Sequence, residues 1–152
     1  MKTKTLRKDK VNVITLGCSK NLVDSENLIT QLRGNDYDVA HDSDREDANI
    51  IVVNTCGFID LAKQESIDTI VQYANIKQAG GIDKLYVTGC LSQRYKDSLE
   101  EAIPEVDAFF GTLEMPALLA KMDADYKYEL LGERQITTLP HYAYLKISEG
   151  CN

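Results

Sequence analysis

Three of the four cysteines each come directly after a short, mainly apolar run: Cys18, Cys56 and Cys90. Cysteine thiolates bind zinc and iron–sulfur clusters, and a thiolate beside a base can also act as a nucleophile. The base would most simply be a histidine, but we interpret His41 and His141 as surface residues. Metal or cluster binding is therefore the chemistry that these cysteines favour.

The spacing of the cysteines bears on which metal they would bind. Structural zinc usually takes four ligands from close pairs such as C-x₂-C, and no such pair occurs here. Three thiolates fit a four-iron cluster with one iron open to a sulfur species or a small substrate. Glycines at 17, 57 and 89 would let the backbone approach such a group closely. The alternative is three unrelated core cysteines, since free cysteine is often buried.

Alternating strands and helices must position these cysteines. The apolar pattern predicts five strands, at residues 11–16, 37–40, 49–54, 84–88 and 108–110. A loop over 19–23 is expected before a helix whose cap and first-turn acid are Asp24 and Glu26. Further helices are expected over 62–78, 95–102 and 116–122. In the helix over 62–78, the apolar stripe comprises Ile67, Ile70, Val71 and Ala74.

This alternation predicts an α/β fold: a doubly wound, mainly parallel five-stranded sheet with helices on both faces and the flavodoxin-like order 2-1-3-4-5. In that order the first, third and fourth strands are neighbours, spaced about 4.7–4.9 Å apart. Each of these strands is followed by one of the three cysteines. We therefore expect the thiols to reach one small cofactor at the edge where such sheets bind ligands.

Length and charge limit the organisation and the partners. The 152 residues suit one ordinary domain, and the formal net charge of −7 argues against direct nucleic-acid binding. We divide the chain into a flexible basic tail (1–10), a cluster domain (11–122), a linker (123–141) and the start of a truncated further domain (142–152). Without a signal peptide or a membrane helix, we expect a cytoplasmic protein, where thiols stay reduced.

Four ordered segments resemble the radical S-adenosylmethionine methylthiotransferases: LGCSKNLVDSE (16–26), NTCGFI (54–59), TGCLSQRY (88–95) and ISEGCN (147–152). The last is similar to the start of the radical domain, where a C-x₃-C-x₂-C motif begins. The forms of 19–24 and 56–59 resemble the type that modifies a ribosomal protein. The tRNA-modifying type tends to carry Gln-Met-Asn where this chain has Ser-Lys-Asn.

The resemblance implies that Cys18, Cys56 and Cys90 ligate an auxiliary 4Fe-4S cluster that carries sulfur. Cys151 would be the first ligand of a second 4Fe-4S cluster, which binds S-adenosylmethionine and is incomplete here. The implied reaction methylthiolates the β-carbon of an aspartate in small-subunit ribosomal protein twelve, a basic substrate that would complement the acidic chain. We expect the 152-residue chain alone to be inactive and to hold no certain catalytic residue.

Four further residues are candidate neighbours of the cluster or the substrate: Lys20, Asn21, Asn54 and Thr55. The last two could donate hydrogen bonds to cluster sulfides or could only satisfy the backbone. Two alternatives for the function stay open. One is the same domain of a tRNA adenosine methylthiotransferase, and the other is a non-catalytic flavodoxin-like binding module that takes up no iron.

Overall fold

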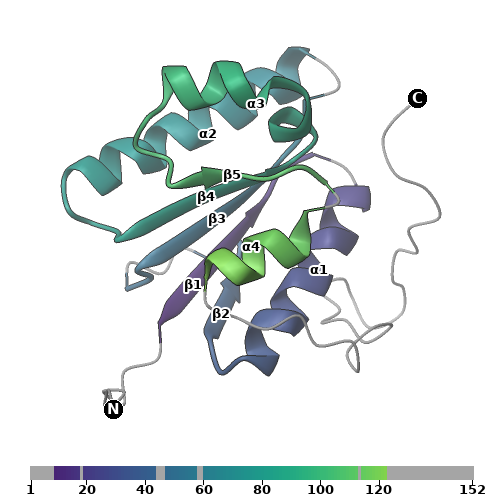
Figure 1. Cartoon of the computed structure of the whole chain (residues 1–152), viewed down its shortest axis with the longest axis vertical. Coiled ribbons are helices and arrows are strands. Elements are labelled where there is room, and N and C mark those ends of the chain that lie inside the picture. The colour runs from purple at the N-terminus through teal and green to yellow at the C-terminus, as the bar shows by residue number, and fades with distance from the viewer. Residues whose placement is uncertain (1–8, 18, 44–46, 58–59, 113, 123–152) are drawn as a thin grey trace.

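The computed structural model describes residues 9–17, 19–43, 47–57, 60–112 and 114–122. Expectations for most of the basic tail, the linker and the further domain fall outside these residues, as do those for Cys18, His141 and Cys151. No helix within the described ranges is long and apolar enough to span a lipid bilayer. The elements run in the order β1 (Lys10–Thr15), α1 (Ser19–Gly34), β2 (Asp38–His41), β3 (Ile50–Thr55), α2 (Asp60–Gln78), β4 (Lys84–Gly89), α3 (Cys90–Ala102), β5 (Ala108–Phe109) and α4 (Met115–Lys121) (Figure 1).

The five strands form one parallel sheet in the order β2-β1-β3-β4-β5, which confirms the predicted fold class. The central strand β3 is buried at every one of its six positions. Its apolar run, Ile50 to Val53, suits a parallel strand that is covered on both faces. The sheet therefore brings the carboxyl ends of β1, β3 and β4 side by side.

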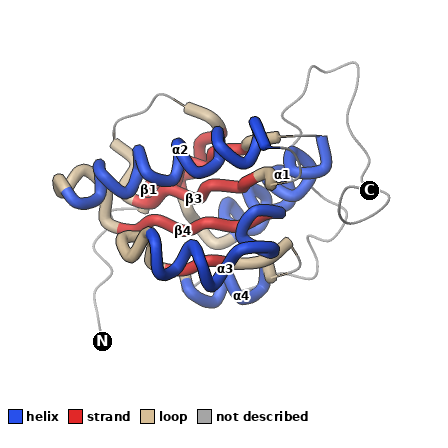
Figure 2. Tube along the Cα trace, turned by 90° about the horizontal axis from the view of Figure 1, so that it is seen from above, coloured by secondary structure: helices blue, strands red, loops and turns tan. Residues whose placement is uncertain are grey.

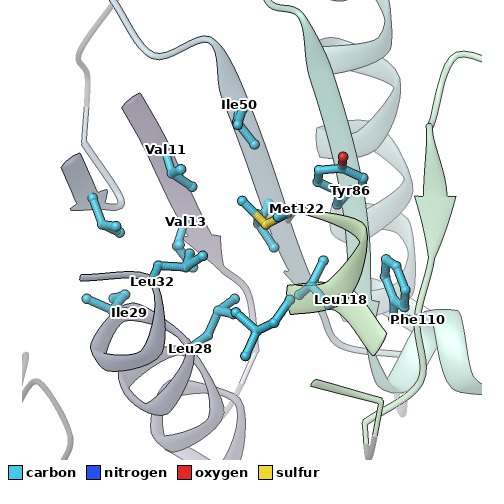
Figure 3. Close-up of a cluster of buried hydrophobic side chains, with 13 residues drawn as sticks. Val11, Val13, Leu28, Ile29, Leu32, Ile50, Tyr86, Phe110, Leu118 and Met122 are labelled. Atoms are coloured by element: carbon cyan, nitrogen blue, oxygen red, sulfur yellow. The ribbon is translucent and has the colours of Figure 1, made fainter. Parts of the chain in front are cut away.

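Helices cover both faces of the sheet (Figure 2). α1 and α4 pack on one face, where Leu28, Leu32 and Leu119 join the inward side chains of β1 and β3. Figure 3 shows Leu28 and Leu32 of α1 and Leu118 of α4 lying close together against the sheet. α2 and α3 cover the other face, where Ile70 and Leu99 meet apolar residues of β3 and β4. Burial on both faces supplies the stabilising free energy of this layered fold.

Two helices begin five residues earlier than the sequence predicted. α1 begins at Ser19 instead of Asp24, and α3 begins at Cys90 instead of Tyr95. The expected loop over 19–23 is therefore wrong, and Asp24 lies inside α1 instead of capping it. The physical reason is a left-handed glycine just before each helix, with φ 93° at residue 17 and φ 100° at residue 89. Glycine adopts a positive φ with little steric cost, so the chain can change direction sharply at these two positions.

The inward face of α2 also differs from the expected stripe. Ser66, Ile70 and Ala74 are its buried residues, whereas Val71 is 40% exposed. The prediction for Val71 is thus wrong, because the helix is rotated so that a serine points at the sheet. Ser66 lies four residues before Ile70 on the same face, a position that the apolar pattern could not assign.

Candidate metal centre

Cys56 and Cys90 lie at the same level of the sheet edge. The last paired residues of β3 and β4 are Thr55 and Gly89, which stand opposite each other in register. A cysteine follows each of them, so the two thiols come from adjacent chain ends. Neighbouring strands are about 4.8 Å apart, which is within the span of a small cluster.

The end of β1 approaches the same point. Leu16 N–H donates to the carbonyl of Asn54 at 2.9 Å, which continues the β1–β3 ladder beyond the strand. A Cβ at Gly17 would lie only 2.9 Å from Cys56 Sγ. The residue before Cys18 thus packs directly on the sulfur of Cys56, although Cys18 itself lies outside the described residues.

The other two glycines allow equally close approaches. A Cβ at Gly89 would lie 2.5 Å from Asn54 Oδ1 and 2.7 Å from Thr55 N. At Gly57 it would lie 2.8 Å from Leu91 Cα. In the described part of the chain, these glycines bring the cysteine-bearing segments against one another. The sequence predicted that these glycines let the backbone approach a cofactor. In the structure they also let the chain segments approach one another.

Asn21 lies among these segments in the first turn of α1 and is 2% exposed. Its side-chain Nδ2 donates to the carbonyls of Leu16 and Thr55, each at 2.7 Å. The thiol of Cys90 faces its Oδ1, with a sulfur–oxygen distance of 4.0 Å. One amide therefore contacts the ends of β1 and β3 and the start of α3.

A chain of buried and partly buried polar side chains extends away from Asn21. Asn54 Nδ2 donates to the Asn21 carbonyl at 2.9 Å and to Ser25 Oγ at 3.0 Å. Thr15 Oγ1 lies 2.7 Å from both Ser25 Oγ and His41 Nε2. The His41 side chain is 18% exposed, so the interpretation of it as a plain surface residue is wrong.

The candidate neighbours differ in what their side chains do. Thr55 Oγ1 donates to the Thr88 carbonyl at 2.7 Å, and the donors of Asn54 are likewise directed within the protein. Of the two roles predicted for Asn54 and Thr55, these hydrogen bonds agree with the one in which both side chains bond other protein groups. Lys20 is half-buried in the first turn of α1.

Ser66 is a residue of the site that sequence reasoning missed. Its Oγ accepts from Cys56 N at 3.1 Å and donates to Cys56 O at 2.9 Å. The hydroxyl therefore satisfies both backbone groups of the cysteine and ties Cys56 to α2. Its role depends on the rotation of α2 about its own axis, which the apolar pattern of the sequence did not predict correctly.

The donor set fits a thiolate-bound iron–sulfur cluster. No group of three or more metal-ligating side chains occurs within the described ranges, which include two of the three expected ligands, Cys56 and Cys90. Soft thiolates favour such clusters, and buried hydrogen-bond donors tune them. Ser92 Oγ is buried two residues after Cys90 and has no hydrogen-bond partner in the described part of the chain. A buried hydroxyl without a partner is rare, and a bound group could satisfy it.

A small open pocket adjoins the cysteine site at the carboxyl edge of the sheet. It lies beside the end of β4, between α1 and α4. Its polar lining comes chiefly from Asp24, Asn54 and Thr88, and its apolar lining comprises Leu28, Met115 and Leu118. Gly89, which precedes Cys90, also lines it. The pocket has room for little more than a water molecule, so it marks an opening at the β4 end and not a binding cavity.

Known proteins resemble the whole of this chain. The family described as "Uncharacterized protein family UPF0004" matches residues 10–111. A protein named ribosomal protein uS12 methylthiotransferase RimO from Cytophaga hutchinsonii is 64% identical over 152 residues. Proteins of the same name from Christiangramia forsetii and Flavobacterium psychrophilum are 58% and 59% identical. The matches cover 100% of this chain and 33–35% of those proteins, so the chain spans about a third of their length.

Proposed function

The chain belongs to the UPF0004 family, and from that premise we propose that it is the iron–sulfur domain of an enzyme that methylthiolates ribosomal protein uS12. The observation that carries the proposal is the convergence of Cys56 and Cys90 at adjacent strand ends, with Gly17 packed on the Cys56 sulfur. The names of the relatives support the reaction class and the substrate.

In the proposed mechanism, Cys18, Cys56 and Cys90 would hold a 4Fe-4S cluster. When bound, this cluster supplies the sulfur that is inserted into the substrate. The protein's own part is to place the three thiols together. Ser66 fixes the backbone of Cys56, and the neighbouring glycines keep the strand ends close. Burial of Cys56, which is 7% exposed, limits the access of water to its sulfur.

The proposed organisation places residues 11–122 in the cluster domain, 123–141 in a linker and 142–152 at the start of a radical domain. Cys151 would be the first ligand of the second cluster, which binds S-adenosylmethionine. S-adenosylmethionine, with one electron from that cluster, would supply the methyl group and the radical chemistry at the aspartate β-carbon. The enzyme would work in the cytoplasm, and the net charge of −7 suits a basic ribosomal protein.

The substrate is tested in cells that lack their own enzyme. A chimera would carry this chain in place of the matching region of the Cytophaga hutchinsonii relative, and mass spectrometry would follow uS12. We expect the methylthio group on an aspartate of uS12, its loss with Cys56→Ala, and its retention with Asn75→Ala on the exposed surface of α2. A modified tRNA with unmodified uS12 would establish the tRNA alternative instead.

A further inference from the structure

We propose that Asn21 is the positioning residue of the cysteine site, and that its side-chain amide sets the relative positions of the three cysteine-bearing segments. The inference rests on the proposed function and extends it to a residue that is not a ligand. The evidence for it is the set of hydrogen bonds that the buried Asn21 side chain makes. The groups that it contacts lie next to the cysteines or belong to them.

Both N–H groups of the Asn21 amide have carbonyl acceptors at 2.7 Å. One acceptor is Leu16 O, two residues before Cys18, and the other is Thr55 O, directly before Cys56. These carbonyls belong to the ends of adjacent strands, at the point where the regular ladder stops. The amide therefore replaces ladder hydrogen bonds there and sets the separation of the two cysteine-bearing ends.

The third segment meets the other side of the same amide. Both N–H groups of the amide donate to carbonyls, so the amide oxygen, Oδ1, is the atom on the side of Cys90. The Cys90 sulfur lies 4.0 Å from it. Oδ1 can accept a weak hydrogen bond from the thiol but has no proton to donate to a thiolate. The Asn21 amide therefore contacts the Cys90 thiol on one side and the ends of β1 and β3 on the other.

Asn21 is itself held from a different direction. Its carbonyl accepts from Asn54 Nδ2 at 2.9 Å, and the same Nδ2 also contacts Ser25 Oγ. Asn54 belongs to β3, so the first turn of α1 is fixed to the central strand. With 2% exposure, the Asn21 side chain has almost no room for another rotamer. Its geometry is therefore set before any ligand binds, which is how an outer residue orients metal ligands.

The amide chemistry makes the role specific to asparagine. Aspartate has nearly the same shape but presents oxygen atoms to the Leu16 and Thr55 carbonyls, which also have no proton to donate. Serine is shorter and has one donor, so it can serve only one of the two carbonyls. The three substitutions therefore differ in what they remove. Both hydrogen bonds to the carbonyls are lost in Asn21→Ala and Asn21→Asp, whereas Asn21→Ser can keep one.

Asn12 offers a matched control. Like Asn21, it is an asparagine that is 2% exposed. Its side-chain amide also hydrogen-bonds the backbone: it donates to Ser43 O at 2.7 Å and accepts from Ser43 N at 3.2 Å. It lies in the first half of β1, away from the end that leads to Cys18. Asn12→Ala therefore removes a comparable buried amide without touching the cysteine segments.

The test is anaerobic reconstitution of the 152-residue chain with iron and sulfide. Iron and sulfide per chain, the electron paramagnetic resonance spectrum of the reduced cluster, and the rate of iron loss to a chelator are measured. We expect Asn21→Ala and Asn21→Asp to lose iron about 10–100-fold faster than wild type, with a changed spectrum. Asn21→Ser should fall between them and wild type, and Asn12→Ala should match wild type in rate and spectrum.

The proposal is overturned if the Asn21 variants keep the wild-type spectrum and release rate, or if Asn12→Ala changes both as much as they do. Should Asn21→Ala fail to fold, Asn21→Ser carries the same comparison. A different result would count against the proposed function instead: wild type that takes up no iron, or a Cys56→Ala variant that keeps a full cluster. Failure of the inference and failure of the proposed function are thus distinguishable.

Discussion

At the scale of single residues, the glycines beside the cysteines control how closely the chain segments approach. Gly89 has φ 100° and ψ −166°, a conformation that is essentially restricted to glycine. Its Cα also faces the end of β3, where an added Cβ would meet Asn54 Oδ1 and Thr55 N. Both the backbone conformation and the lack of space therefore require glycine immediately before Cys90.

Gly89→Ala is expected to lower the free energy of unfolding by more than about 3 kcal/mol, because strain and overlap add. Gly80→Ala is the matched control, since Gly80 also has positive φ, 84°, but a Cβ there meets no atom within 4 Å. We expect it to cost only about 1–2 kcal/mol. Urea unfolding of both variants measures the difference, and equal losses would mean that the contact with β3 is unimportant.

At the scale of elements, Asp107 connects three of them just before β5. Its Oδ2 accepts from Lys77 Nζ of α2 and from Leu85 N of β4, each at 2.8 Å. Desolvation by burial raises the pKa of Asp107, but the hydrogen bonds from Lys77 and Leu85 and the charges of Lys77 and Lys84 together leave it lowered. The short edge strand β5 is thus fixed by ionic contacts as well as by its pairing with β4.

Asp107→Asn should lower the free energy of unfolding at neutral pH by about 1–3 kcal/mol, since it removes a charged acceptor from two donors. A lowered folded-state pKa stabilises the protein above the unfolded-state value, and that contribution is lost as pH falls through the folded-state pKa. The difference from wild type should therefore shrink below about pH 4. Asp97→Asn, on the exposed surface of α3, should change little at any pH, and a pH-independent gap would contradict the account.

The sequence predicted the strands of this fold better than the helix starts. The apolar runs of β3 and β4 are short and are bounded by polar residues or glycine, so a strand is the simplest prediction for each. Their positions could therefore be predicted closely. The starts of α1 and α3 depend on glycine backbone conformations and on contacts with β3, which no local pattern contains. The kink in α3 is a second reason. Tyr95 has a non-helical φ of −126°, so the residues before and after it do not share one regular helical spacing.

At the scale of the whole molecule, the short helix α4 completes the core on the face that α1 covers (Figure 3). Its Leu118 and Leu119 are 2% and 0% exposed and pack with α1 and the sheet. A helix of seven residues is not stable alone, so this packing must hold it in place. The sheet edge that carries the cysteines therefore depends on a core extending to residue 122.

Leu119→Ala is expected to lower the free energy of unfolding by about 2–5 kcal/mol, through lost burial and the cavity left behind. Leu61→Ala provides the control, since Leu61 is 83% exposed on α2 and should change stability by less than about 0.5 kcal/mol. Thermal and urea unfolding would measure both. A loss below about 1 kcal/mol for Leu119→Ala would show that α4 is not part of the cooperative fold.

The site could be predicted from sequence only in part. Cys56 and Cys90 repeat one local position, and a parallel sheet turns that repetition into proximity. Asn21 and Ser66 act through hydrogen bonds to backbone groups far along the chain, so their contacts depend on the strand order and the helix rotation. The place of Asn21 in the segment after Cys18 predicts only that it could lie near a cluster, and no local pattern predicts a role for Ser66.

The most direct test of the central claim is the cluster content of single cysteine variants after anaerobic reconstitution. The account predicts a four-iron cluster in the wild-type chain and its loss in Cys18→Ala, Cys56→Ala and Cys90→Ala, each measured as iron and sulfide per chain. Cys151→Ala should keep the cluster, because Cys151 is proposed to serve a different one. A full cluster in any one of the first three variants, or no iron in the wild type, would contradict the account.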